Sequence, residues 1–133
     1  MRYFERVIDQ SLLAWKQETS RKTLLLRGAR QTGKTTAVRQ FSKSFEHFVE
    51  VNFEQERGVQ EFFAGDLDVR AICAKLEMRY NTPILPGRTL LFLDEIQSCP
   101  NAISALRYFY EDYPELHVVA SGSLLDTATA AMP

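Results

Sequence analysis

The sequence predicts an α/β domain with a parallel β-sheet, and two observations lead to this prediction. Short apolar runs alternate along the chain with longer segments of helical spacing. This alternation is typical of a parallel sheet whose strands are joined by right-handed crossover helices. The chain has 133 residues, 45% of them hydrophobic, which suits one domain with a real core. We therefore expect a single domain over residues 1–133, with an N-terminal helix over 1–20 and a core over 21–133.

Four short segments are predicted to be strands. Two of them, TLLLR and TLLFL, are apolar on both faces, as expected for strands buried between two helix layers. A third, HFVEVNF, alternates and places Val49, Val51 and Phe53 on one face. The predicted strands are residues 23–27, 47–53, 89–93 and 117–120. Together with the helices they predict a three-layer sandwich, with helices on both faces of the sheet.

Four segments carry apolar residues at helical spacing, and local signals mark some of their ends. Asp66 or Asp68 can cap the third helix, and Pro100 suits the first turn of the fourth. Two prolines and a glycine make residues 81–87 a loop. The predicted helices are residues 3–17, 34–45, 68–80 and 100–113.

Charge and cysteine content exclude several classes of protein. The 16 basic and 17 acidic residues give a net charge of −1, which argues against a broad surface for nucleic acid or anionic membrane. Cys73 and Cys99 are far apart in sequence, as expected of free buried thiols in a reducing compartment. The N-terminus lacks a secretory signal, and no apolar run approaches the ~18 residues that cross a bilayer. We expect a cytoplasmic protein without a membrane partner.

Residues 28–35, GARQTGKT, match the pattern G-x-x-x-x-G-K-S/T and lie between a predicted strand and a predicted helix. In this context the backbone N–H groups of the loop can form a nest for anions, strengthened by the N-terminus of the helix. Lys34 can reach the β- and γ-phosphates, and the Thr35 hydroxyl is a suitable Mg²⁺ ligand. The alternative is an ordinary tight turn. We predict phosphate binding by Gly28, Ala29, Arg30, Gln31, Thr32, Gly33, Lys34, Thr35 and Thr36.

Two adjacent carboxylates follow the third predicted strand. Asp94 and Glu95 stand at the carboxyl end of this strand, where ligands bind in open α/β sheets. We assign Asp94 to the metal and Glu95 to general-base activation of a water, both ionised at neutral pH beside a cation. The alternative is a solvated strand end. A kinase does not need a water-activating carboxylate here, so Glu95 favours a hydrolase.

The fourth predicted strand ends in ASGSLL. A polar residue at this point, beside the strand of Asp94, can hold the attacking water or sense the γ-phosphate. Ser121 is the first candidate and Ser123 the second, against the alternative of a plain Ser-Gly turn.

Together, RGARQTGKTT, LLFLDEIQ and VVASGSLL resemble the prokaryotic AAA-family ATPases (AAA+/STAND-like), in which an N-terminal P-loop ATPase domain precedes a C-terminal domain of unknown function. The resemblance implies a P-loop NTPase fold of the additional-strand type, with strand order 5-1-4-3-2 and the fifth strand absent from this sequence. It also implies ATP and Mg²⁺, bound by Walker A and Walker B motifs. Lys34, Thr35, Asp94, Glu95 and Ser121 occupy the matching positions.

Three functions remain in view. The first is an ATPase that couples hydrolysis of the γ-phosphate to a missing C-terminal domain. The second is a nucleotide-gated switch with negligible turnover, and the third is a DNA-acting motor or loader. The sequence identifies no arginine finger and no adenine contact, and it leaves the target protein or DNA and any self-association open.

Overall fold

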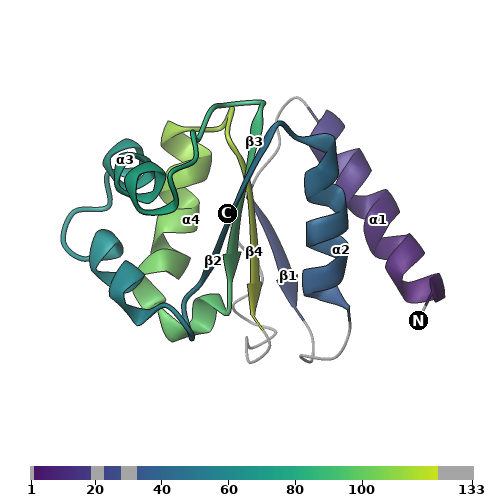
Figure 1. Cartoon of the computed structure of the whole chain (residues 1–133), viewed down its shortest axis with the longest axis horizontal. Helices are drawn as coiled ribbons and strands as arrows, with labels where there is room; N and C mark the ends of the chain where they lie inside the picture. The colour runs from purple at the N-terminus through teal and green to yellow at the C-terminus, as the bar shows by residue number, and fades with distance from the viewer. Residues whose placement is uncertain (1, 19–22, 28–32, 123–133) are drawn as a thin grey trace.

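The computed structural model describes residues 2–18, 23–27 and 33–122. Helices and strands alternate along this part of the chain (Figure 1). The helices are α1 (Arg2–Gln17), α2 (Lys34–Phe41), α3 (Val69–Tyr80) and α4 (Pro100–Asp112). The strands are β1 (Leu24–Arg27), β2 (His47–Asn52), β3 (Thr89–Asp94) and β4 (His117–Gly122). Three short 3-10 helices are η1 (Ser42–Ser44), η2 (Arg57–Phe63) and η3 (Ile96–Ser98).

The described strands form one sheet in the order β1-β4-β3-β2, and every neighbouring pair is parallel. This confirms the predicted α/β class and the 1-4-3-2 part of the predicted strand order. The central strands β3 and β4 are buried along their whole length, as their apolar sequences predict. Consecutive strands β1 and β2 lie at opposite edges of this sheet, and β4, the last of the described strands along the chain, pairs with β1.

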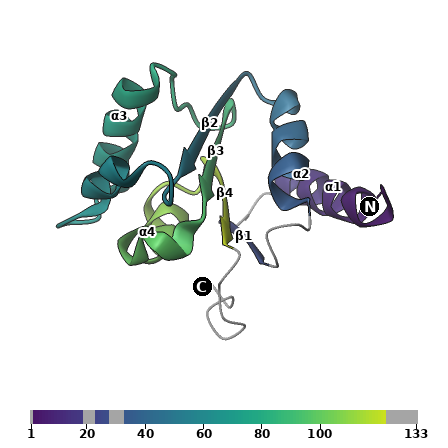
Figure 2. The same ribbon diagram turned by 60° about the horizontal axis from the view of Figure 1, so that its bottom comes forward.

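Helices cover both faces of the sheet, so the molecule has three layers (Figures 1 and 2). Helices α1 and α2 lie on one face and bury Leu12, Trp15 and Val38 against Phe92 and Val119 of the central strands. Helices α3 and α4 lie on the opposite face, over a second core. Members of this larger core include Val51, Phe63, Ile72, Leu76, Leu93, Leu106 and Phe109.

Helix α2 ends earlier than its apolar spacing predicts. The α-helix stops at Phe41 rather than continuing to residue 45, and η1 follows it. The Ser42 hydroxyl donates a 2.6 Å hydrogen bond to the carbonyl of Arg39, and the Ser44 hydroxyl donates one of 2.9 Å to the carbonyl of Phe41. These carbonyls would otherwise accept from backbone N–H groups of a further turn, so the serines favour the helix end.

Strand β1 is only half-buried, although its sequence predicts burial on both faces. Among the described strands it pairs with β4 alone and lies at the edge of the sheet. An edge strand lacks a neighbour on one side, which leaves its side chains and backbone partly accessible. The apolar composition of residues 23–27 therefore predicts helices on both faces of the sheet, but it does not predict that β1 lies at the edge of the sheet.

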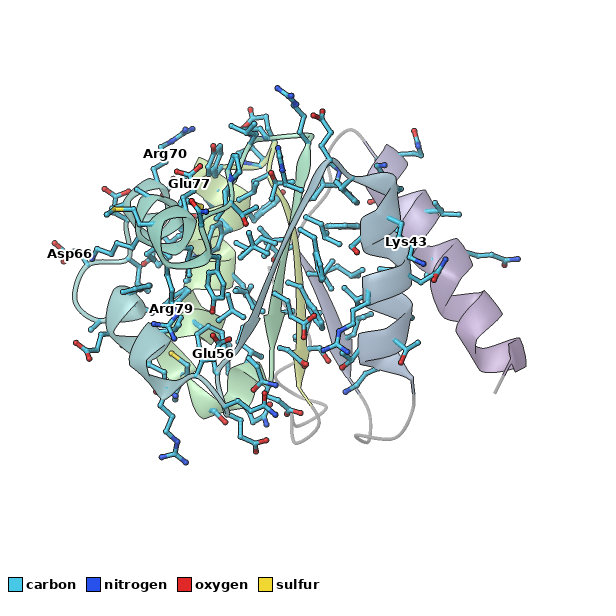
Figure 3. All side chains as sticks on the ribbon, viewed as in Figure 1. Lys43, Glu56, Asp66, Arg70, Glu77 and Arg79 are labelled. Carbon is cyan, nitrogen blue, oxygen red and sulfur yellow. The ribbon has the colours of Figure 1, made fainter. Side chains whose placement is uncertain are left out.

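Predicted caps of the later helices are confirmed. The Asp68 carboxylate accepts from the backbone N–H groups of Arg70 and Ala71, so it caps α3. Pro100 occupies the first turn of α4. On the α3 side of the sheet, Glu56 accepts a 3.0 Å hydrogen bond from the Tyr80 hydroxyl, near Arg79 (Figure 3). This contact attaches η2 to the end of α3, a feature that the sequence did not reveal.

Cys73 and Cys99 are both free and buried, as predicted. Burial raises the pKa of Cys73 to about 12. No helix in the described part of the chain combines the length and apolar character that a membrane span requires.

Candidate active site

The predicted site residues come from segments far apart in sequence that meet at the carboxyl edge of the sheet. The arrows of β1 and β4 point to this edge in Figure 1, and α2 begins beside it. In the register of the sheet, Asn52 pairs with Asp94, and Leu93 pairs with Ala120. Asp94 and Ser121, each one residue further along, therefore lie at the ends of neighbouring strands. This is the edge where open parallel sheets bind their ligands.

Gly33 sets the direction in which α2 starts. Its φ of 81° and ψ of 12° lie in the left-handed region, which a glycine adopts at little cost. Its carbonyl accepts the first bond of the helix, from Ala37 N–H at 2.9 Å. Lys34 and Thr35 follow directly in the first turn, so Gly33 positions both side chains over the end of β3.

Only part of the predicted phosphate-binding set can be placed. Thr36 is exposed on the first turn of α2, while Lys34 is buried. The remaining loop residues lie outside the described residues, and so does Ser123. These loop residues are Gly28, Ala29, Arg30, Gln31 and Thr32.

The hydroxyl of Thr35 donates a hydrogen bond of 3.3 Å to Oδ2 of Asp94. This contact joins the two residues that the sequence assigns to the metal. Two adjacent ligands of an octahedral Mg²⁺, each about 2.1 Å from the ion, lie about 3 Å apart, so this pair of oxygens fits the ion. Among the described residues, no group of three or more His, Cys, Asp or Glu could hold a metal. Mg²⁺ commonly takes its remaining ligands from water and phosphates.

Burial and charge act against each other at this site. Burial raises the pKa of Asp94, while hydrogen bonds from the Glu95 N–H, at 2.9 Å, and from Thr35 lower it. Burial also lowers the pKa of Lys34, which is only 5% exposed, and the nearby charges of Glu95 and Asp94 partly restore it. The site thus holds one ammonium and two carboxylates close together, with Lys34 and Asp94 both buried, an arrangement in which a bound cation or anion would interact strongly.

Glu95 follows β3 in an unusual backbone conformation, with φ 51° and ψ 47°. Its Oε1 accepts a 2.8 Å hydrogen bond from Nε2 of Gln97. Sequence reasoning noted Gln97 only as part of the motif LLFLDEIQ and assigned it no place in the site. The sequence could have indicated this contact only through the position of Gln97, two residues after Glu95.

Ser121 is 1% exposed near the end of β4. Side chains alternate along a strand, and Val119, two residues earlier, packs in the core on the α2 side of the sheet. Ser121 therefore faces that side. The same reasoning places Asp94, two residues after Phe92, on this face, in agreement with its contact to Thr35.

The Arg39–Glu50 ion pair beside the site was not predicted, whereas Asn52 was noted in the sequence either as a supporting residue near the metal side or as a solvated strand end. Arg39 of α2 forms a bidentate ion pair with Glu50 of β2, at 2.8 Å and 2.7 Å, and the charge of Glu50 contributes to the raised pKa of Asp94. Asn52 ends β2 and accepts hydrogen bonds from the N–H groups of Glu54 and Gln55. These bonds form a turn of the kind that Asn favours, so the side chain of Asn52 supports the strand end.

A cavity of about 390 Å³ lies away from these residues, at the C-terminal end of α2 and beside α1. Its lining includes Leu13, Phe41 and Lys43, the last of which is labelled in Figure 3. Since Lys34 begins the same helix, the cavity is separate from the cluster of Lys34, Thr35 and Asp94.

Comparisons with known proteins agree with this geometry. The sequence model of one family, described as "AAA domain", matches residues 20–131. The chain belongs to this AAA domain family. No curated protein matches it. Among solved structures, it is similar to the Orc1 protein of Aeropyrum pernix in complex with DNA, with a TM-score of 0.57 at 18% identity. The match covers 98% of this chain and 42% of the Orc1 chain.

Membership of the AAA family confirms the resemblance noted in the sequence, and the Orc1 similarity confirms the P-loop NTPase-like fold. The general function is therefore that of a nucleotide-binding AAA domain, and the AAA family is generally one of ATPases. The present chain spans less than half the length of the Orc1 chain.

Proposed function

We propose that this AAA domain binds ATP with Mg²⁺ through its Walker A and Walker B motifs and hydrolyses the γ-phosphate. The observation that carries the proposal is the contact of Thr35 with Asp94, beside the buried ammonium of Lys34. The buried ammonium of Lys34 is suited to the negative triphosphate, and the neighbouring hydroxyl–carboxylate pair is suited to the metal bound to it. The glycine-initiated α2 directs its N-terminus to the same place, where helices favour bound phosphate.

In this proposal, Lys34 neutralises the β- and γ-phosphate oxygens, and the N–H groups of residues 28–33 would cradle the phosphates. Thr35 and Asp94 hold the metal, directly or through a water. The metal supplies charge neutralisation on the transferring phosphoryl group. Thr36 lies on the exposed side of the same helical turn, where it could contact the α-phosphate.

Glu95 is the proposed general base. It directly follows Asp94, and its charge already acts on Lys34, so it lies within the influence of the phosphate site. It would accept a proton from the water that attacks the γ-phosphate. Ser121, at the end of the neighbouring strand, would hold this water or respond to the γ-phosphate.

Hydrolysis would change the contacts of this edge of the sheet, and we propose that a C-terminal domain of the same protein senses this change. The proposal includes residues 1–133 as one ATPase domain in the cytoplasm.

Calorimetric titration with Mg-ATP and a phosphate-release assay on the full-length protein, beside residues 1–133, test the proposal. Glu95→Gln should retain ATP affinity and lose phosphate release. Glu111→Gln is the matched control, because Glu111 is an exposed residue of α4 that pairs with Arg107, outside the site. Absence of heat with Mg-ATP would refute nucleotide binding. Binding without phosphate release by the wild-type protein would refute hydrolysis and favour a nucleotide-gated switch.

A second candidate is an ATPase that acts on DNA. The similar Orc1 structure is a complex with DNA, although the similarity extends to the fold alone. The net charge of −1 argues against a broad DNA surface on this domain. Salt-sensitive DNA binding that stimulates phosphate release would support this candidate, because DNA contacts release counterions and weaken with salt. Turnover that is indifferent to DNA would exclude it.

A further inference from the structure

The side chain of Gln97 connects η3 to the carboxylate of Glu95. Its Nε2 donates a hydrogen bond of 2.8 Å to Oε1 of Glu95. Its own Oε1 is buried and has no hydrogen-bond partner in the part of the chain that the structure describes. One half of this amide is therefore used on Glu95, while the other half is left unsatisfied.

The backbone of Glu95 is fixed in a conformation that side chains rarely adopt. Among the described residues, only Glu95 and Asn81 combine a side chain with a positive φ, and Asn81 caps the end of α3, where asparagine is common. The N–H of Glu95 donates to Oδ1 of Asp94, and its carbonyl accepts from the N–H of Ser98 at 3.1 Å. Backbone strain of this kind persists only where surrounding contacts hold it. The Gln97 bond adds a restraint on the side chain to these two restraints on the backbone.

Stability alone does not account for a glutamine at this position. A buried carbonyl oxygen without a donor destabilises the folded state, and an apolar side chain of similar length would avoid that cost. What glutamine provides, and an apolar residue cannot, is a donor to the carboxylate of Glu95. This bond fixes the carboxylate on the same turn that places it next to Asp94.

We propose that Gln97 is a positioning residue that holds the carboxylate of Glu95 in the orientation required to accept a proton from the attacking water. This inference rests on the proposed ATP hydrolysis. A carboxylate can accept several hydrogen bonds, so a bond from Gln97 is compatible with a bond from a water. Gln97 acts through Glu95 and does not itself contact the nucleotide.

The test is Gln97→Met in the full-length protein, because methionine keeps the length of the side chain and removes both amide groups. We expect kcat for ATP hydrolysis to fall about 10-fold to 100-fold, the usual range for a residue that orients a reacting group. KM for ATP and the calorimetric Kd should stay within about 2-fold. The variant should unfold at no lower temperature than the wild type, since the unpaired oxygen is gone.

A double-mutant cycle separates positioning from a general effect on the fold. In a Glu95→Gln background, Gln97→Met should leave the residual rate unchanged, because the carboxylate that it orients is absent. Gln97→Asn, one methylene shorter, is a second variant that keeps the amide and should recover only part of the rate.

The remaining outcomes of these experiments distinguish failure of the role proposed for Gln97 from failure of the proposed ATP hydrolysis. If the wild type hydrolyses ATP and Gln97→Met retains kcat within about 2-fold, positioning by Gln97 is wrong and the proposed hydrolysis stands. If Gln97→Met lowers the residual rate as strongly without Glu95 as with it, or unfolds at a clearly lower temperature, Gln97 has a structural role instead. If the wild type binds ATP and releases no phosphate, the proposed function and this inference both fail.

Discussion

Replacing Lys34 by methionine should separate nucleotide binding from folding. Lys34 is 5% exposed, and the nearby charges of Glu95 and Asp94 already compensate part of its charge. The phosphates would therefore replace part of the interaction that Lys34 already has with these two carboxylates. For this reason we take the free energy of each hydrogen bond from Lys34 to phosphate at the lower end of its usual range, about 1.5 kcal/mol. Two such bonds, to the β- and γ-phosphates, sum to about 3 kcal/mol, or a roughly 100-fold loss of affinity.

The same substitution should not destabilise the nucleotide-free protein. Burial lowers the pKa of Lys34 despite the two carboxylates, so the charged form is less favourable in the folded state than in water. A thioether of similar length removes this cost, and the free energy of unfolding should stay within about 1 kcal/mol of the wild type or rise. Calorimetric titration with Mg-ATP and thermal unfolding without nucleotide measure the two effects.

Lys43→Met is the matched control for this experiment. Lys43 lies in η1, shortly after the end of α2, is exposed, and lines the separate cavity. Its replacement should change neither ATP affinity nor stability. Equal affinity of Lys34→Met and wild type would refute the assignment of the phosphate site. Loss of ATP affinity in Lys43→Met but not in Lys34→Met would indicate that the nucleotide binds at the cavity instead.

Three further predictions concern charge, thiols and packing. Because the pKa of Asp94 is raised above 3.8, the folded state binds this proton more tightly than the unfolded chain does. The stability of the metal-free protein therefore falls as the pH rises from 3.8 through the raised pKa of Asp94. Asp94→Asn should weaken this pH dependence in urea unfolding, stabilise the metal-free protein at neutral pH and abolish Mg²⁺-dependent turnover. Burial raises the pKa of both Cys73 and Cys99, so a thiol reagent at neutral pH should label them only after unfolding, and rapid labelling of the native protein would contradict their burial. Leu106→Ala in the core, at 0% exposure, should cost about 2–5 kcal/mol in urea unfolding, whereas Met78→Ala, at 85% exposure, should change stability by less than about 0.5 kcal/mol, and equal effects would refute the assigned core.

Elements with a strong period were predictable from the sequence, and short elements held by local side-chain bonds were not. The alternation of Val49, Val51 and Phe53 predicts which face of β2 is buried, because successive strand residues point to opposite faces. By contrast, η3 has only three residues and is too short to show a period. The end of α2 depends on the hydroxyls of Ser42 and Ser44, which apolar spacing does not report.

The sequence by itself determined which residue types stand at each end of the predicted strands, and hence which chemistry the domain can carry. The glycine that starts α2, the lysine and threonine after it, and the carboxylates after β3 are all local features of the chain. Only the tertiary structure decided that Thr35 meets Asp94 across 59 positions, because that distance depends on the order of the strands. It also decided that Lys34 is buried. Burial and hydrogen-bond geometry arise from packing between segments, a property that spacing along the chain does not contain.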